Sequence, residues 1–219
     1  MEANSMHHCR VSGARVWRGQ TMDDRSAERR QQLVDVCMDL LGTAGAASVT
    51  LRAVCRAAEL SPRYFYENFS SREELLIATY DQVERQLFER LVEAGEGRQK
   101  RSIRSVLEIC GQYFEEDPRR ARILLREPMS DETLRVHQSG KKPVFIRSLI
   151  PALESTGRKL APPDSRELEV MATALSGALI SLYLEWIDGR LSVERDTLVD
   201  TAGRLVTAIA RASQRKPAR

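Results

Sequence analysis

The chain has 219 residues, of which 42% are hydrophobic and 30% are charged, and its formal net charge is +3 at pH 7. This length suffices for one large domain, or for a small domain beside a larger one, and either can bury a core without disulfides. Because charges of both signs are interspersed, the composition is typical of a soluble cytoplasmic protein. It excludes a strongly basic or acidic chain, so any basic patch must be local.

The N-terminal residues 1–23 predict a flexible arm. They include arginines but no apolar run, so they do not form a secretory signal. Met22 is an alternative start and coincides with the beginning of recognisable structure. If removal of residues 1–21 lowers only the affinity for DNA, the arginines of the arm reach DNA; these are Arg10, Arg15 and Arg18.

From residue 24 onward, apolar residues recur at helical spacing and no stretch alternates as a strand does, which predicts an all-α fold. Asp24 or Ser26 can cap a first helix that ends at Gly45. Its predicted apolar stripe consists of Leu33, Val36, Cys37, Leu40, Leu41 and Ala44.

Two short helices follow. Thr50 can cap the first (LRAVCRAAE), and Ser61 with Pro62 can open the second, since serine can accept an orphan amide bond and proline has no amide to leave unpaired. Ser70 and Ser71, followed by acidic residues, form a capping box for a fourth helix that continues to Gly95. We expect a joint between two parts of the chain at residues 95–100.

The remainder predicts a larger helical unit. Residues 103–114 form one amphipathic helix, and Asp117 with Pro118 starts the next. Between residues 127 and 163 the pattern is weak, and Pro151 is expected to kink a helix there. Two clear helices cover residues 164–188 and 192–213.

The last two helices are apolar around much of their circumference. The longest apolar run, residues 171–186, is short of the roughly 20 residues that a membrane span needs, and it predicts a buried helix. We expect a pair of helices from each of two chains to form a four-helix bundle, that is, a homodimer. The candidate interface residues are Leu175, Leu179, Leu182, Leu198, Leu205 and Ile209.

The two short helices have the spacing of a helix-turn-helix, whose second helix enters the DNA major groove. In SPRYFYENF (residues 61–69), Phe65 and Phe69 share one face and should be buried. Tyr64 and Tyr66 flank that face and can hold phosphates with their hydroxyls. Arg63 is the candidate for a bidentate contact to guanine, while Arg52 and Arg72 can clamp phosphates.

The run TLRAVCRAAELSPRYFYENFSSREELL (residues 50–76) resembles the DNA-binding signature of the TetR family of transcriptional regulators. It has a tyrosine followed by a phenylalanine three residues on, and an S-x-[KR]-E capping step. The resemblance implies an N-terminal DNA-binding domain (residues 24–70), a connecting helix (71–97) and a ligand-binding and dimerisation domain (98–219). It implies DNA-binding roles for Thr50, Arg52, Ser61, Pro62, Arg63, Tyr64, Tyr66, Asn68 and Arg72.

Two residues depart from the family pattern. Glu59 stands in the turn where the family usually has glycine, so a residue with a side chain must adopt a positive φ, at a cost of about 1 kcal/mol or more. Tyr64 stands where a smaller residue is common, which changes the phosphate contact or base reading expected there.

The resemblance also implies that a small molecule in the C-terminal domain alters the separation of the two recognition helices. The absence of a run of charge in its predicted core favours an apolar or aromatic effector. Each candidate pocket residue also fits an ordinary place in the core, and packing is the favoured role for each. The candidates are Cys110, Tyr113, Phe114, Met129, Phe145, Met171, Leu175, Tyr183 and Trp186.

Few residues suggest another class of function. The cysteines form no CxxC pair and read as small buried residues of a reducing compartment; they are Cys9, Cys37, Cys55 and Cys110. His7 and His8 have no second cluster to complete a metal site, and His137 is expected on the surface. We therefore expect no metal, no cofactor and no enzyme active site.

These observations predict a regulator that binds a palindromic operator as a homodimer and is released by its effector, with repression as the default mode. Its partners would be double-stranded DNA, a small molecule and a second copy of the chain, without a membrane. The alternatives are a helical interaction module whose helix-turn-helix does not bind DNA, and an all-α enzyme.

Overall fold

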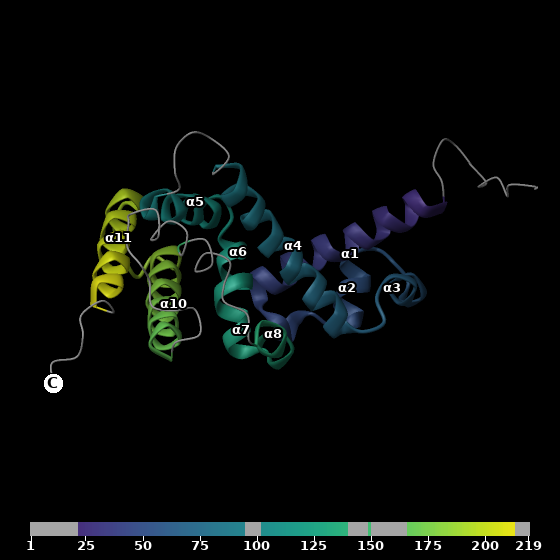
Figure 1. The fold of residues 1–219 in the computed structure, drawn as a ribbon. Helices are drawn as coiled ribbons and strands as arrows, with labels where there is room; N and C mark the ends of the chain where they lie inside the picture. Colours follow the sequence, from purple (N-terminus) through teal and green to yellow (C-terminus); the bar gives the residue numbers. More distant parts are fainter. Residues whose placement is uncertain (1–21, 95–101, 140–148, 150–165, 213–219) are drawn as a thin grey trace, which may run out of the picture.

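The computed structural model describes residues 22–94, 102–139, 149 and 166–212, and within these ranges it is all-helical, as predicted. The first helices are α1 (Met22–Ala44), η1 (Ala46–Ser48), α2 (Leu51–Ala57), α3 (Pro62–Asn68) and α4 (Arg72–Glu93). They are followed by α5 (Ile103–Glu116), α6 (Pro118–Ala121), η2 (Arg122–Arg126), α7 (Glu127–Ser130), α8 (Glu132–Gln138), α10 (Arg166–Ile187) and α11 (Arg195–Ala212). The molecule is elongated, with α3 near one end and α11 at the other (Figure 1).

Capping residues fix the ends of the N-terminal helices. The hydroxyl of Thr50 accepts a hydrogen bond from Ala53 N, that of Ser71 accepts one from Glu74 N, and Gly45 ends α1 with a φ of 84°. Ser61 occupies the N-cap position of α3, but its hydroxyl caps no amide, contrary to expectation. Because this first turn is exposed, water can satisfy its amides instead.

One continuous core runs through the N-terminal helices. Leu33, Cys37 and Leu41 of α1 are fully buried, as predicted. Val34 is buried as well, whereas Val36 is only partly covered, so the buried stripe of α1 is turned toward Val34 relative to the expected one. This rotation places α1 against both α3 and α4.

Three of the four cysteines lie in the described ranges, and all three are free and buried, as predicted: Cys37, Cys55 and Cys110. Burial raises the pKa of Cys37 to about 11 and that of Cys110 to about 12. At neutral pH these thiols are therefore protonated and unreactive. Cys9 lies outside the described residues.

In the second half, α6, η2 and α7 follow one another without a break, and η2 is a single π-helical segment. Pro128 explains it, because proline has no amide to donate to Leu124, four residues earlier. The chain instead bonds Glu127 N to Arg122 O across five residues. The break near residue 140 and the kink at Pro151 lie outside the described residues.

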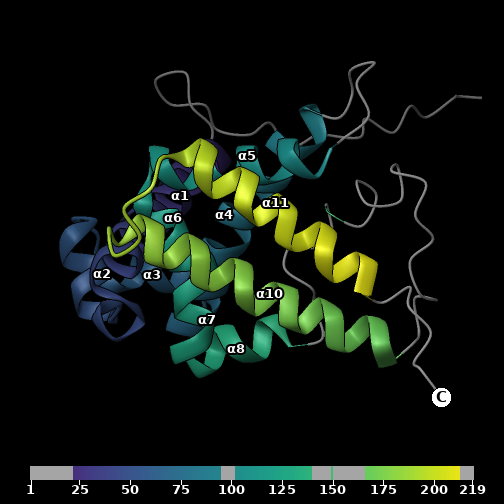
Figure 2. The same ribbon diagram turned by 90° about the vertical axis from the view of Figure 1, so that its left-hand side faces the viewer.

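Helix α10 is less buried than predicted. Leu175, Leu179 and Tyr183 face the core, but only 17% of the window Glu169–Ile187 is buried. By length and composition alone, this segment could also cross a membrane, a test that the core helix of a soluble protein passes as well. Figure 2 shows α10 and α11 running side by side on the end of the molecule turned to the viewer.

Candidate nucleic-acid interface

The turn between α2 and α3 has the predicted strain. Ala58 N donates to Val54 O and Leu60 N to Cys55 O, and between them Glu59 adopts a φ of 53°. Of the residues other than glycine that the structure describes, Glu59 alone has a positive φ. Since glycine adopts this conformation without steric cost, the side chain of Glu59 makes the turn more costly than the family pattern requires.

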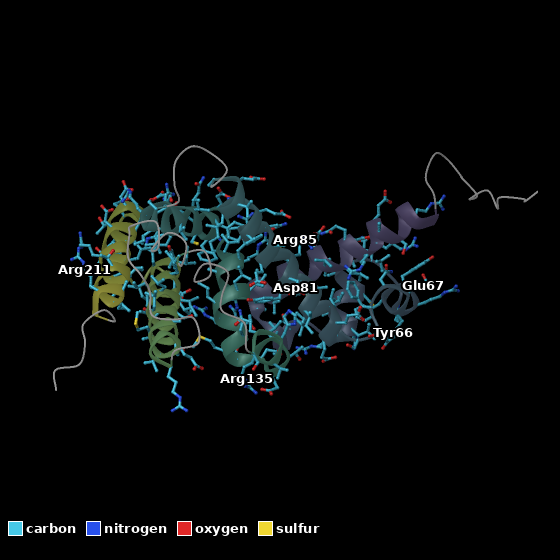
Figure 3. All side chains as sticks on the ribbon, viewed as in Figure 1. Tyr66, Glu67, Asp81, Arg85, Arg135 and Arg211 are labelled. Carbon is cyan, nitrogen blue, oxygen red and sulfur yellow. The ribbon has the colours of Figure 1, made fainter. Side chains whose placement is uncertain are left out.

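The four rings of α3 divide as predicted. Phe65 and Phe69 are each 1% exposed and lie 6.1 Å apart between ring centroids, so they anchor the helix to the core. Tyr64 and Tyr66 are 40% and 58% exposed. Tyr66 lies at the outer end of the molecule (Figure 3). The buried rings thus hold the exposed ones in place.

Arginines of α1 stack on these rings, a contact that the local sequence pattern did not reveal. The guanidinium carbon of Arg29 lies 4.9 Å from the centroid of the Tyr64 ring, and that of Arg30 lies 4.4 Å from the Phe69 ring. Such cation–π contacts fix the orientation of the rings. They also bring positive charge from α1 next to the exposed face of α3.

The other predicted DNA-binding residues of this region differ in how exposed they are. Thr50, Arg52, Ser61 and Pro62 are exposed, and the hydroxyl of Thr50 keeps its hydrogen to donate because it only accepts from Ala53 N. Asn68 is half-buried, and its Nδ2 donates to Tyr64 O at 2.8 Å while its Oδ1 accepts from Ser26 Oγ. Its amide therefore ties α3 to α1.

Arg72 has its donors directed inward. Its Nε donates to Val49 O and its Nη2 to Ala46 O, both at 2.6 Å, and Nη1 lies 3.3 Å from a carboxylate oxygen of Glu73. The side chain is 29% exposed. In this geometry Arg72 braces the loop between α1 and α2 against α4, and little of the guanidinium is left for the predicted phosphate clamp.

Comparison with known proteins identifies this region. The profile described as "Bacterial regulatory proteins, tetR family" matches residues 33–79. The HTH-type transcriptional regulator BetI of Rhizobium meliloti (strain 1021) is 41% identical over 51 residues, which cover 23% of this chain and 25% of BetI. Residues 33–79 carry a DNA-binding domain of the TetR type.

Solved structures extend the likeness to the whole fold. A TetR-like regulator from Rhodococcus sp. RHA1 is 22% identical, with a TM-score of 0.60, over 83% of this chain and 94% of that one. FadR from Bacillus subtilis, solved in complex with stearoyl-CoA, is 14% identical with a TM-score of 0.62, over 80% and 96% of the two chains. At these identities the likeness shows the fold alone.

The TetR-type domain is joined to the C-terminal helices through a buried carboxylate. Glu127 is 3% exposed, and its Oε2 accepts from Ala46 N at 2.8 Å while its Oε1 accepts from Arg122 Nε at 3.0 Å. Arg122 also donates to Thr43 O. Gly45 has a φ of 84°, and a Cβ there would lie 2.9 Å from the guanidinium of Arg122, so a side chain at this position would strain the backbone and crowd this pair.

Most of the predicted effector residues fill the core of the C-terminal domain. Cys110, Tyr113, Phe114 and Tyr183 are at most 2% exposed, and the Phe114 ring lies 5.4 Å from the Tyr183 ring. Leu175 is also buried, and Met171 and Trp186 are partly covered. Tyr113 donates to Val83 O and Tyr183 to Leu107 O. Rings tethered in this way are packed against the backbone of α4 and α5.

One effector prediction is wrong, and another falls outside the described residues. Met129 is 72% exposed, so its expected place in an interior pocket is wrong. The reason is that Glu127 and Pro128 occupy the buried side of this short turn. Phe145 lies outside the described residues.

Two cavities border described residues of the C-terminal half. One, of about 280 Å³, is lined by Tyr113 together with Gln86, Glu89, Arg90, Glu93 and Arg120. Arg90 and Arg120 lie 5.0 and 4.3 Å from the Tyr113 ring. The other, of about 620 Å³, lies between the start of α5 and the outer side of α11. Of the predicted effector residues, Tyr113 lines the smaller of these two cavities.

The predicted dimer residues are turned largely inward. Leu175, Leu179 and Leu198 are between 0% and 7% exposed inside their own chain, so their assignment to the dimer interface is wrong. The other three predicted interface residues are partly covered; they are Leu182, Leu205 and Ile209. The large side chains pack on α5, and smaller ones remain outside. The exposed stripe of α10 consists of Val170, Thr173, Ala174, Gly177 and Ser181.

Histidines and metal ligands give no further site. His137 was expected on the surface, but it is half-buried and bonded. Its Nε2 lies 2.6 Å from Asp81 Oδ1 and its ring contacts Tyr80, so it links α8 to α4. Within the described part of the chain, no group of three or more potential ligands could hold a metal ion. His7 and His8 lie outside that part.

Proposed function

We propose that this protein is a cytoplasmic transcriptional regulator of the TetR family, by default a repressor, that binds a palindromic operator as a homodimer and is released by a small effector. The observation that carries the proposal is the build of α3. Two buried phenylalanines hold it, and Arg63, Tyr64 and Tyr66 are exposed on its other faces. No other feature of the described surface combines a rigid short helix with exposed arginine and tyrosine in this way.

On DNA, α3 enters the major groove. Arg63 donates to guanine O6 and N7, and the hydroxyls of Tyr64 and Tyr66 hold phosphates on either side. Thr50 and Arg52, both exposed at the start of α2, bind the flanking backbone together with Ser61. Asn68 and Arg72 take part by holding α3 and α4 in place, because their polar groups are engaged within the protein.

The homodimer forms through the outer faces of α10 and α11. Small residues on α10 allow a second helix to approach closely, and the partly covered Leu182, Leu205 and Ile209 flank that approach. Two recognition helices then lie about one or more turns of DNA apart, roughly 34 Å or a multiple. A palindromic operator follows from the twofold symmetry of the dimer.

An effector in the C-terminal domain acts by preferring the conformation that does not fit DNA. An apolar or aromatic compound suits the apolar core of this domain, and the stearoyl-CoA complex of FadR is consistent with such a ligand. Motion would reach the TetR-type domain through the Glu127 joint and α4. The proposed division is residues 24–70 for DNA, 71–97 for the connecting helix and 98–219 for ligand and dimer.

The test is selection of genomic fragments by the purified protein, followed by affinity measurements on the fragments recovered. A regulator should retain fragments that share a palindrome, and log K should fall linearly with log[salt]. Genes beside these fragments would indicate the effector. Recovery of unrelated fragments only, without a common site, would favour the interaction module with a helix-turn-helix that does not bind DNA.

A further inference from the structure

An ion pair lies on the exposed face of the recognition helix. Arg63 Nε donates to Glu67 Oε1 at 3.0 Å, one helical turn along α3. The side chains are 85% and 41% exposed. Glu67 lies beside Tyr66 at the outer end of the molecule, the end opposite Arg211 of α11 (Figure 3). An acidic residue therefore stands on the surface that would face DNA phosphates.

Stability of α3 does not explain this pair. Arg63 lies in the first turn of the helix and Glu67 in the last, so each charge faces the end of the helix dipole with its own sign. The order of arginine before glutamate is also the weaker one for pairs four residues apart. At such exposure an ion pair contributes little to folding in any case.

The geometry instead prepares Arg63 for a base. Glu67 engages Nε, and among the described residues neither Nη1 nor Nη2 has an acceptor. These two nitrogens form the end of the guanidinium that can donate side by side to O6 and N7 of guanine. The pair thereby favours one orientation of a long, exposed arginine before it meets DNA, which reduces the entropy lost on binding.

The carboxylate also limits binding to DNA of any sequence. Sequence-independent affinity comes from cations that neutralise phosphates, and a paired Arg63 adds almost no net charge to the surface. A phosphate near α3 meets the Glu67 carboxylate, whereas a guanine edge meets the two donors of Arg63. The pair thus weakens contacts of α3 to phosphates more than the contact of Arg63 to guanine.

We propose that Glu67 is a positioning residue for Arg63 that sets the specificity of this protein for guanine in its operator. The inference rests on the proposed DNA-binding function. It assigns to Glu67 a role that lies in discrimination between sequences, not in affinity as such.

The test compares Glu67→Gln with Glu89→Gln. Glu89 is a matched control because it forms an Arg–Glu pair of the same order and spacing with Arg85 on α4, at 3.9 Å and similar exposure. Affinities are measured for a duplex recovered by genomic selection, for the same duplex with 7-deazaguanine in place of guanine, and for an unrelated duplex. The 7-deaza base lacks the N7 acceptor that Arg63 would use.

For Glu67→Gln we expect unrelated DNA to be bound roughly 3- to 10-fold more tightly, and the ratio of specific to unrelated affinity to fall about tenfold. The penalty for 7-deazaguanine should shrink as well. Glu89→Gln should behave as the unaltered protein does. Thermal unfolding of each variant, followed by circular dichroism, ensures that only folded protein is compared, and Glu67→Ala serves as a second substitution.

A double-mutant cycle isolates the coupling. In an Arg63→Ala background, Glu67→Gln should no longer change the penalty for 7-deazaguanine. An unchanged specificity ratio for Glu67→Gln, or an equal effect with and without Arg63, would overturn the inference and leave the DNA-binding function standing. If the unaltered protein shows no salt-dependent preference for any duplex, the role of Glu67 and the proposed DNA-binding function are both contradicted.

Discussion

At the scale of single residues, Glu59 and the faces of α3 show how local rules operate in this protein. The turn before α3 requires a positive φ whichever residue stands there, and the described structure has Glu59 at 53°. The same local rules divide α3 into phenylalanines that are buried and tyrosines that are exposed. Both features follow from short-range geometry, and both give direct predictions.

Glu59→Gly should stabilise the protein. Glycine removes the steric cost of a left-handed residue, and this gain exceeds the loss caused by the greater entropy of glycine in the unfolded chain. We therefore expect the free energy of unfolding to rise by about 0.5–1 kcal/mol. That corresponds to a rise in melting temperature of about 1–4 °C for a chain of this size. Glu59→Ala, which keeps a Cβ, should change little. A loss of stability in Glu59→Gly, seen in urea unfolding, would contradict the account of strain.

Arg63→Ala and Tyr66→Phe should weaken DNA binding in different ways. Loss of the guanidinium removes a base contact and should cost about 1–3 kcal/mol for the specific duplex, with little change for unrelated DNA. Loss of the hydroxyl removes a phosphate contact and should weaken both duplexes alike. Equal patterns in an electrophoretic or fluorescence titration of the two variants would show that these roles are misassigned.

At the scale of elements, α10 shows where periodicity is ambiguous. Its large residues and its small ones form two different stripes, and both are apolar enough to be buried. The large stripe packs on α5 and α11 within the chain, so the small stripe is left for a partner. The sequence could not show which of the two stripes is buried, because alanine and glycine occur at helical spacing on exposed and on buried faces alike.

Gly177→Leu tests that partner. In the single chain, a Cβ at Gly177 would meet no atom within 4 Å, and leucine has the higher helix propensity by roughly 0.8 kcal/mol, so the monomer itself should tolerate the change. At a close helix contact the added bulk should separate two chains. We expect dimers to become monomers in light scattering, while Gln112→Arg on the exposed face of α5 leaves them intact. A Gly177→Leu dimer of unaltered stability would place the interface elsewhere.

At the scale of the whole molecule, the joint at Glu127 unites the two halves. Its carboxylate reaches back 81 residues to bond Ala46 N and also pairs with Arg122. Arg72 strengthens the same loop from α4 through Val49 O and Ala46 O. The loop between α1 and α2 is thus held from two sides. Arg72 of α4 binds it on one side, and Arg122 of η2 with Glu127 of α7 binds it on the other.

Glu127→Gln should destabilise the protein by about 1–3 kcal/mol, since it leaves the half-buried Arg122 without its charged partner. Glu185→Gln, in an exposed pair with Arg190, should leave the melting temperature unchanged. If the joint couples the halves, Glu127→Gln should also reduce the effect of the effector on DNA affinity. Stability equal to that of the Glu185→Gln control would show that the joint contributes nothing.

From its sequence alone, this protein could be predicted to be all-helical and to have a helix-turn-helix with a strained turn, because capping residues, 3.6-residue periodicity and the Ser-Pro start act within a few residues. The exposed tyrosines and Arg63 were predictable for the same reason. The tertiary structure alone decided that Met129 lies outside, that Arg72 turns inward, and which stripe of α10 faces the core. These outcomes depend on contacts between residues far apart in the chain, such as Glu127 with Ala46, and no local pattern records which of two apolar faces a distant helix will cover.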